Sequence, residues 1–207
     1  MKATSRSTPR VTFSALCEFL SASPVRQISI LREQKAPKPA HVRSYTTAIQ
    51  HIQDFAINKK PLNASASDLE PHEQEVILEL LNNEWTPPAK KVMRPLKQQP
   101  MKLKGVQISV FPDLLLADGN GRRSTTGAMK FYCTKSRELK AEVGRWMASF
   151  LYCYSQTILK DATADPDLCM IYDVRADEYY EAGKSYKRLF QNIESACQII
   201  ASLWPNV

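Results

Sequence analysis

Two residues in the C-terminal half of the chain, Asp113 and Lys130, are of types that could act on a phosphate ester. Asp113 follows Pro112 at a bend between apolar runs, and Lys130 lies in the middle of an apolar, strand-like segment. A carboxylate can bind a hard divalent cation, and an ammonium group can stabilise negative charge that develops during a reaction. Two more acids, Glu138 and Glu142, follow Lys130 at the spacing of one helical turn.

Each of these residues also has a purely structural interpretation. Asp113 could form an Asx-type turn at the bend, and Lys130 could lie at a sheet edge with its ammonium group reaching water along an apolar stem. Glu138 and Glu142 could pair with neighbouring basic residues or complement a helix dipole. The sequence leaves both interpretations open.

Other kinds of site have weaker support. The five cysteines are scattered and contain no CxxC pair, which argues for reduced thiols in a cytoplasm and against a disulfide scaffold or a zinc finger. The segment DGNGRRS contains two glycines but lacks the lysine and the following helix of a phosphate-binding P-loop. No apolar run approaches the roughly 18 residues of a membrane helix, so a membrane partner is not expected.

Basic residues are concentrated in the first and middle parts of the chain. The net charge is +7, with 8 Lys and Arg against 2 Asp and Glu in residues 1–50, and 13 against 4 in residues 86–145. Residues 151–200 are acidic, with 5 against 8. This distribution is compatible with a face that meets phosphate, although basic residues also keep ordinary domains soluble. The candidate nucleic-acid contacts are Lys90, Lys91, Arg94, Arg122, Arg123, Lys135 and Arg137.

The elements that must position these residues fall into three segments. Residues 1–85 show helical periodicity and are predicted to form a helical N-terminal region. Residues 86–105 hold four prolines and no acid, which predicts a basic linker or extended arm. Residues 106–207 are predicted to form an α/β core, to which the helix at 72–85 could also belong.

The predicted order of the core is helix, strand or hairpin, strand, long helix, strand, short hairpin partner and closing helix. This order resembles the PD-(D/E)XK nuclease superfamily, the fold of many restriction and repair nucleases. The resemblance covers roughly residues 72–204 and rests on Asp113 after Pro112, on Lys130 in the next strand and on the glycine-containing turn between them. The family has an acid two residues before the lysine, where this chain has Ala128. The implied fold is α+β, with a restriction-endonuclease-like mixed sheet flanked by helices.

The resemblance also implies site roles. Asp113 would hold Mg²⁺ or Mn²⁺, and Lys130 would orient the attacking water or stabilise charge. Glu142 would replace the missing strand acid as second metal ligand, with Glu138 as the next choice and Glu75 or Glu79 as further ones.

Two functions follow as hypotheses. One is a metal-dependent nuclease that hydrolyses phosphodiester bonds of DNA or RNA, with DNA as the first choice. The other is an inactive module that binds nucleic acid or an acidic protein surface, as a regulator or component of a bacterial defence, phage or mobile-element system. Ala128 favours the second, and the sequence leaves the oligomeric state open, a dimer included.

Overall fold

The computed structural model of the chain describes residues 8–36, 44–95, 99–119, 124–135, 138–157, 163–184 and 186–207. It combines helices with two sheets that contain both parallel and antiparallel pairs, which confirms the predicted α+β class. The helices are α1 (Phe13–Ser21), α2 (Pro24–Lys35), α3 (Thr46–Asn58), α4 (Pro71–Asn82), α5 (Ala141–Thr157) and α6 (Tyr186–Leu203), with the short 3-10 helices η2 (Pro166–Leu168) and η3 (Trp204–Asn206). The strands are β1 (Arg10–Thr12), β2 (Lys91–Met93), β3 (Met101–Leu103), β4 (Val106–Ser109), β5 (Leu114–Asp118), β6 (Thr125–Tyr132), β7 (Met170–Asp173) and β8 (Glu178–Glu181).

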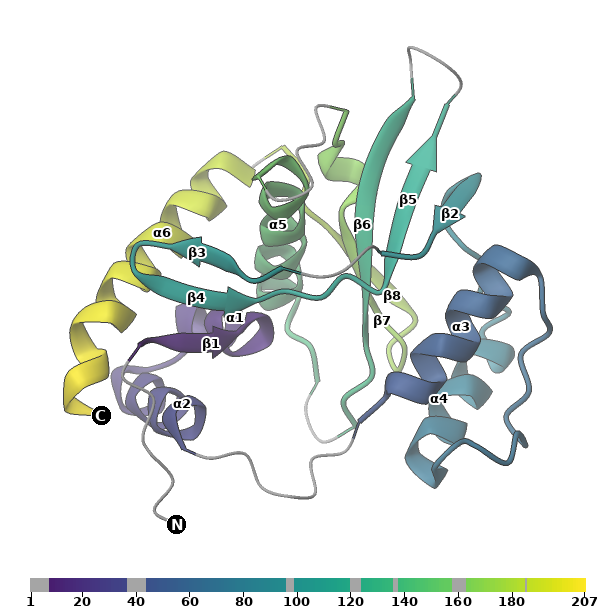
Figure 1. Cartoon of the computed structure of the whole chain (residues 1–207), viewed down its shortest axis with the longest axis horizontal. Coiled ribbons are helices and arrows are strands. Elements are labelled where there is room, and N and C mark those ends of the chain that lie inside the picture. The colour runs from purple at the N-terminus through teal and green to yellow at the C-terminus, as the bar shows by residue number, and fades with distance from the viewer. Residues whose placement is uncertain are drawn as a thin grey trace.

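The larger sheet has the strand order β2-β5-β6-β7-β8. The first three strands are antiparallel neighbours, and β7 then adds parallel to β6 after the chain has crossed through α5. β8 pairs antiparallel with β7, which confirms the predicted hairpin partner. Helices α3 and α4 lie on one side of this sheet, and α5 lies on the other (Figure 1).

Side chains of the larger sheet alternate between two hydrophobic cores, as the two-residue period of a strand requires. In β5, Leu114 and Leu116 pack with α3 and α4, whereas Leu115 packs toward α5. In β6, Met129 faces α3 and α4, and Ala128 faces α5. Lys130, two residues after Ala128, therefore lies on the α5 face of the sheet.

The N-terminal region divides between these two cores. β1 pairs parallel with β4, and α1 packs against α5 and α6, so residues 8–36 join the core of the C-terminal half. α3 and α4 pack together on the opposite face of the larger sheet. The helices predicted over 1–85 therefore share their buried surfaces with residues 101–204 and do not form a core of their own.

The segment predicted as a linker, 86–105, provides strands to both sheets. β2 pairs with β5 at the edge of the larger sheet, and β3 pairs with β4 in the smaller sheet of order β1-β4-β3. No side-chain pattern marks these strands, because three-residue strands held by backbone hydrogen bonds need no side-chain periodicity.

Two element boundaries also differ from expectation. The apolar run 106–118 forms β4 and β5, which belong to different sheets and are separated by a bend at Pro112. The long helix begins at Ala141, so Glu138 precedes it. Among the described residues, no helix combines the length and apolar character needed to cross a membrane.

Candidate functional site

The bend between β4 and β5 brings Asp113 beside Lys130. Leu114 pairs with Met129 in the β5–β6 ladder, and the Asp113 amide donates to the Met129 carbonyl oxygen at 2.8 Å. Asp113 therefore lies one residue before the paired part of β5, beside Lys130, the residue that follows Met129 in β6. The Gln53 side chain of α3 donates to the Asp113 carbonyl oxygen at 2.7 Å and fixes the bend from the other side.

Lys130 and Asp113 form an ion pair, and each of the two side chains also makes a hydrogen bond with the backbone. Lys130 Nζ lies 3.2 Å from Asp113 Oδ1 and 3.3 Å from Oδ2, and it donates to the Phe111 carbonyl oxygen at 2.9 Å. The Phe131 amide donates to Asp113 Oδ2 at 2.8 Å. The side chains of Lys130 and Asp113 are 24% and 11% exposed. Burial raises the pKa of Asp113 above its ordinary value, and the Lys130 charge with the Phe131 amide counteracts part of that rise.

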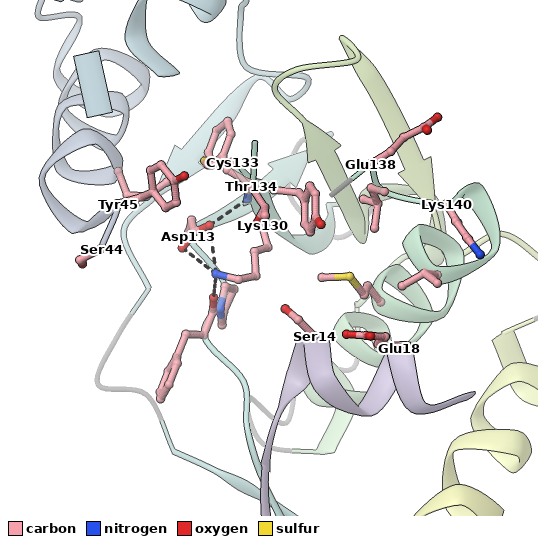
Figure 2. A pocket seen from close by; sticks show the side chains of 18 of the residues that line it. Ser14, Glu18, Ser44, Tyr45, Asp113, Lys130, Cys133, Thr134, Glu138 and Lys140 are labelled. Carbon is pink, nitrogen blue, oxygen red and sulfur yellow. Dashed lines mark hydrogen bonds and ion pairs between the residues drawn. The ribbon is translucent and has the colours of Figure 1, made fainter. Parts of the chain in front are cut away.

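The ion pair lies on the wall of a cavity of about 1270 Å³. Three further groups of described residues line it: α1 with the turn into α2, the N-terminal end of α3, and residues 138–147. Figure 2 shows the Lys130 side chain turned toward Asp113 at one side of this space, with Ser14 and Glu18 of α1 on the other side and Glu138 farther from Asp113.

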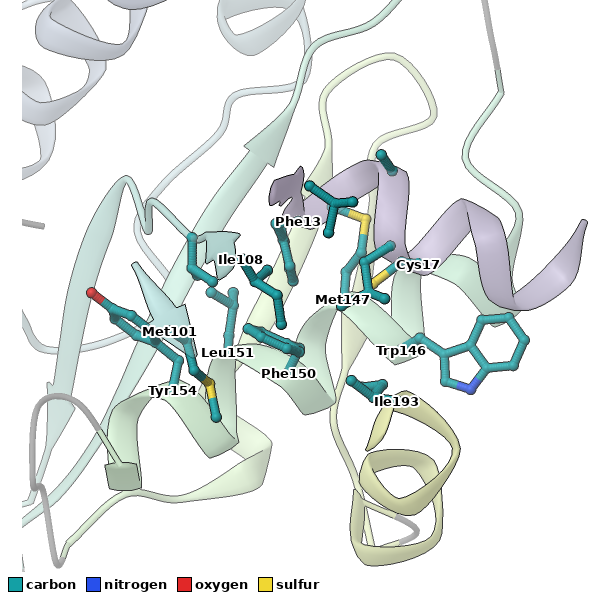
Figure 3. Close-up of a cluster of buried hydrophobic side chains, with 14 of the residues drawn as sticks. Phe13, Cys17, Met101, Ile108, Trp146, Met147, Phe150, Leu151, Tyr154 and Ile193 are labelled. Atoms are coloured by element: carbon teal, nitrogen blue, oxygen red, sulfur yellow. The ribbon is translucent and has the colours of Figure 1, made fainter. Parts of the chain in front are cut away.

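Packing in the core holds the α1 wall in place. Phe13 at the start of α1 stacks on Phe150 of α5, with ring centroids 5.5 Å apart. Cys17, on the next turn of α1, lies near Met147 of α5 (Figure 3). Thr12 caps the helix by accepting from the Ala15 amide at 3.3 Å. Contacts with α5 therefore help to fix the position of α1, and α5 covers the same face of the larger sheet on which Lys130 lies.

A buried carboxylate holds the α3 wall. Glu73 of α4, 3% exposed, accepts from the amides of Thr47 and Ala48 at 2.9 and 3.2 Å. The same side chain also accepts from the Glu70 amide at 3.2 Å. The Glu73 carboxylate thus accepts hydrogen bonds from backbone amides at the start of both α3 and α4, where amides lack partners within the helix.

The charges that line the cavity nearly balance. Arg26, Lys130 and Lys140 are cationic, and Glu18, Asp113 and Glu138 are anionic. The Arg26 guanidinium donates to Glu18 at 2.9 Å and also pairs with Glu33. Most of these charges are therefore arranged in pairs.

The predicted second metal ligand is not at this site. Glu142, in the first turn of α5, is exposed and is not among the residues that line the cavity. Glu138 lines the cavity, but it precedes α5, so Glu138 and Glu142 do not lie one turn apart on the same helix. Ala128, where the resemblance would place a strand acid, is fully buried in the core beneath α5.

Glu75 and Glu79 have a structural role on the far side of the sheet. Both pair with Arg175 in the turn between β7 and β8, each at 3.1 Å. Glu75 also pairs with Lys135 at 3.0 Å, which accounts for this candidate nucleic-acid contact. These acids therefore join α4 to the sheet and do not line the cavity.

The donor set does not fit a divalent cation. Within the described ranges, no three His, Cys, Asp or Glu side chains come together as metal ligands. Asp113 brings one carboxylate, and both of its oxygens already accept hydrogen bonds from Lys130 or Phe131. Mg²⁺ needs an octahedral shell of oxygen ligands and usually more than one acidic or phosphate donor.

The site also offers no cysteine nucleophile. Cys133 lines the cavity, but burial raises its pKa to about 12, so the thiol stays protonated and unreactive at neutral pH. All five cysteines are free and buried, in agreement with the prediction of reduced thiols.

Of the remaining candidate nucleic-acid contacts, the three that the structure describes do not line the cavity. Lys90, Lys91 and Arg94 follow the β2 edge of the larger sheet, where Arg94 pairs with Asp54 at 2.8 Å. Arg122, Arg123 and Arg137 lie outside the described residues. Sequence reasoning missed the residues that α1 and α3 bring to the cavity, since no local pattern marks them.

No protein-family model, curated protein or solved structure matches this chain, so the function must be argued from the site itself.

Proposed function

We propose that this protein binds nucleic acid on a nuclease-like core that lacks a metal centre, with the Lys130 ammonium group as its central phosphate contact. The observation that carries the proposal is the placement of this group. The Phe111 carbonyl oxygen holds Lys130 Nζ at 2.9 Å on the wall of a cavity of about 1270 Å³. A fixed cation at the wall of a large cavity suits an anionic group that enters from solvent.

The order of the elements supports the nuclease-like part of the proposal. Helix α4 is followed by three antiparallel strands, β2, β5 and β6, then by the crossing helix α5 and the parallel strand β7. This is the order that the PD-(D/E)XK core has, with Asp113 before its second strand and Lys130 on its third. Proteins that share a core can differ in chemistry, so the site decides the activity.

The hydrogen bonds of Lys130 leave room for a phosphate. An ammonium group has three donors, and the contacts to the two Asp113 oxygens, at 3.2 and 3.3 Å, are long for charge-assisted bonds of about 2.7–2.9 Å. The ammonium group can therefore turn toward a phosphate oxygen while it keeps the bond to Phe111.

The proposal excludes metal-dependent cleavage on the basis of the residues present. The strand acid is replaced by Ala128 in the core, and Glu142 does not reach the cavity. Asp113 alone does not provide the ligands for a divalent cation.

The test combines binding and cleavage on the same samples. Purified protein is titrated into labelled single- and double-stranded DNA and RNA over a range of salt, with and without Mg²⁺ or Mn²⁺. Lys130→Gln is compared with Lys102→Gln, which removes an equal charge from an exposed residue of β3 outside the cavity. We expect salt-sensitive binding without cleavage, and Lys130→Gln alone should weaken binding and lower the salt slope by about 1.

Two results contradict the proposal in different ways. Cleavage that needs the metal and disappears in Asp113→Ala makes the protein a nuclease. Absence of binding to every nucleic acid, or equal loss in both lysine variants, removes Lys130 as a phosphate contact.

A further inference from the structure

We infer that the cavity beside Lys130 accepts single-stranded nucleic acid in preference to an uninterrupted duplex, with Phe111 as a stacking surface for an unpaired base. The inference rests on the proposed function and specifies its ligand. Three features of the cavity support it: its walls, the exposed ring next to its cation, and its hydroxyl groups.

The position of the cation within the cavity disfavours a duplex. Lys130 is about three-quarters covered, and α1, the start of α3 and residues 138–147 surround the space in front of it. Proteins that read a duplex usually insert a projecting helix or ribbon into a groove, of which the major one is about 12 Å wide. Here the phosphate-binding atom lies inside a concavity, which a flexible single strand can enter but the surface of a rigid duplex cannot fill.

The size of the cavity suits a polymer segment. Its volume of about 1270 Å³ exceeds the roughly 300–1,000 Å³ of common small-ligand pockets. The space therefore admits more than one nucleotide unit beside the phosphate on Lys130.

Phe111 connects an aromatic surface directly to the cation. Phe111 is 40% exposed and is one of the residues that line the cavity, and its carbonyl oxygen accepts a hydrogen bond from Lys130 Nζ at 2.9 Å. An exposed aromatic ring at a fixed position next to a phosphate contact is the combination that single-strand binders use, since every base has a face that can stack.

A second ring is fixed on the same wall. Tyr45 lines the cavity near Asp113 (Figure 2), and its ring meets the edge of His72 with centroids 5.1 Å apart at 77°. His72 is held in turn by a 2.7 Å hydrogen bond to the Ser44 carbonyl oxygen. Tyr45 is therefore oriented before any ligand arrives.

Hydroxyl groups complete the lining. Ser14, Ser44 and Thr134 all line the cavity, from α1, from the residues before α3 and from the end of β6. Hydroxyl groups are common partners of phosphate and sugar oxygens and read no base sequence. We therefore expect little sequence preference.

The test is fluorescence anisotropy with one labelled DNA strand, used alone and annealed to its complement, and with the same strand as RNA. Phe111→Ala is compared with Ile199→Ala, which shortens another exposed apolar residue, on α6 and outside the cavity. We expect tighter binding of either single strand than of the duplex. Phe111→Ala should weaken single-strand binding by about 5- to 100-fold, with duplex binding and melting temperature unchanged, and Ile199→Ala should change neither affinity.

The outcomes separate this inference from the proposed function. Binding of the duplex as tightly as the single strand overturns the inference and leaves the proposed function in place. A single-strand preference that Phe111→Ala leaves intact removes Phe111 as the stacking surface. Failure of all three probes to bind overturns the proposed function and the inference together.

Discussion

Replacing Lys130 by methionine should destabilise the protein by leaving a buried carboxylate without its cation. Asp113 is 9% exposed, and after the change the Phe131 amide remains as a donor to Oδ2. Removing one partner of a fully buried ion pair costs about 3–5 kcal/mol. Because the Lys130 side chain is 24% exposed and one amide bond survives, we expect a loss of about 2–3 kcal/mol at pH 7.

The double variant Asp113→Asn, Lys130→Met should recover part of this loss. Asparagine keeps an oxygen for the Phe131 amide and carries no charge, so the sum of the two single effects should exceed the double effect by about 1–2 kcal/mol. The assay is urea unfolding followed by tryptophan fluorescence. Lys135→Met is the matched control, because Lys135 is 63% exposed and its pair with Glu75 should contribute little.

The pH dependence gives an independent readout of the same pair. Burial already raises the pKa of Asp113, and Lys130 is a charge that lowers it, so the variant raises that pKa further. A carboxyl group with a raised folded-state pKa contributes stability below its unfolded pKa of about 3.9 and loses it as the pH rises through the folded value. The loss in unfolding free energy caused by Lys130→Met should therefore be largest near pH 7 and become smaller toward pH 5. A deficit below about 1 kcal/mol at pH 7, or one that grows on acidification, would refute the reasoning.

Three further predictions concern the cavity walls, the sheet and the metal. Glu73→Ala should cost about 2–3 kcal/mol in urea unfolding, because it removes the shared cap of α3 and α4; Glu73→Gln, which keeps an acceptor oxygen, should cost less, and equal costs would contradict the capping role. Gly127→Ala should cost about 3 kcal/mol or more, since a Cβ there would lie 2.1 Å from the Leu168 carbonyl oxygen. Gly183→Ala, which meets no atom within 4 Å, should cost about 1 kcal/mol through its positive φ, and a similar cost at both glycines would count against the steric argument. Mg²⁺ should leave the melting temperature unchanged, whereas a site filled at 100 times its Kd would add about 2.7 kcal/mol; a rise that Asp113→Ala abolishes would restore the metal site.

The sequence predicted the elements whose signals are local. The periodicity of residues 186–203 and the strand-like runs around Lys130 and at 170–173 correspond to α6, β6 and β7. Pro112 correctly marked a bend. The helix expected at 72–85 corresponds to α4, which begins with Pro71 and a capping box formed by Glu70 and Glu73. Such signals depend on contacts within a few residues, which the chain specifies directly.

The short strands could not be predicted in this way. β1 spans three residues, and Arg10, its first residue, pairs with Gln107, so its partner is almost a hundred residues away. The periodicity of Val11 suggested a helix, but its buried position belongs to this strand. β2 and β3 also span only three residues each, too few for a side-chain pattern, and they are held by backbone pairing with β5 and β4.

The sequence by itself determined the chemistry that the site can offer: one acid after a proline, one strand lysine, and an alanine where the family has an acid. Only the tertiary structure decided which residues share the site. It joined Asp113 and Lys130 across two strands, left Glu142 outside the cavity and placed Ala128 in the core. It also added walls from α1 and α3, because the packing of these helices is set by non-local hydrophobic contacts that no local sequence pattern encodes.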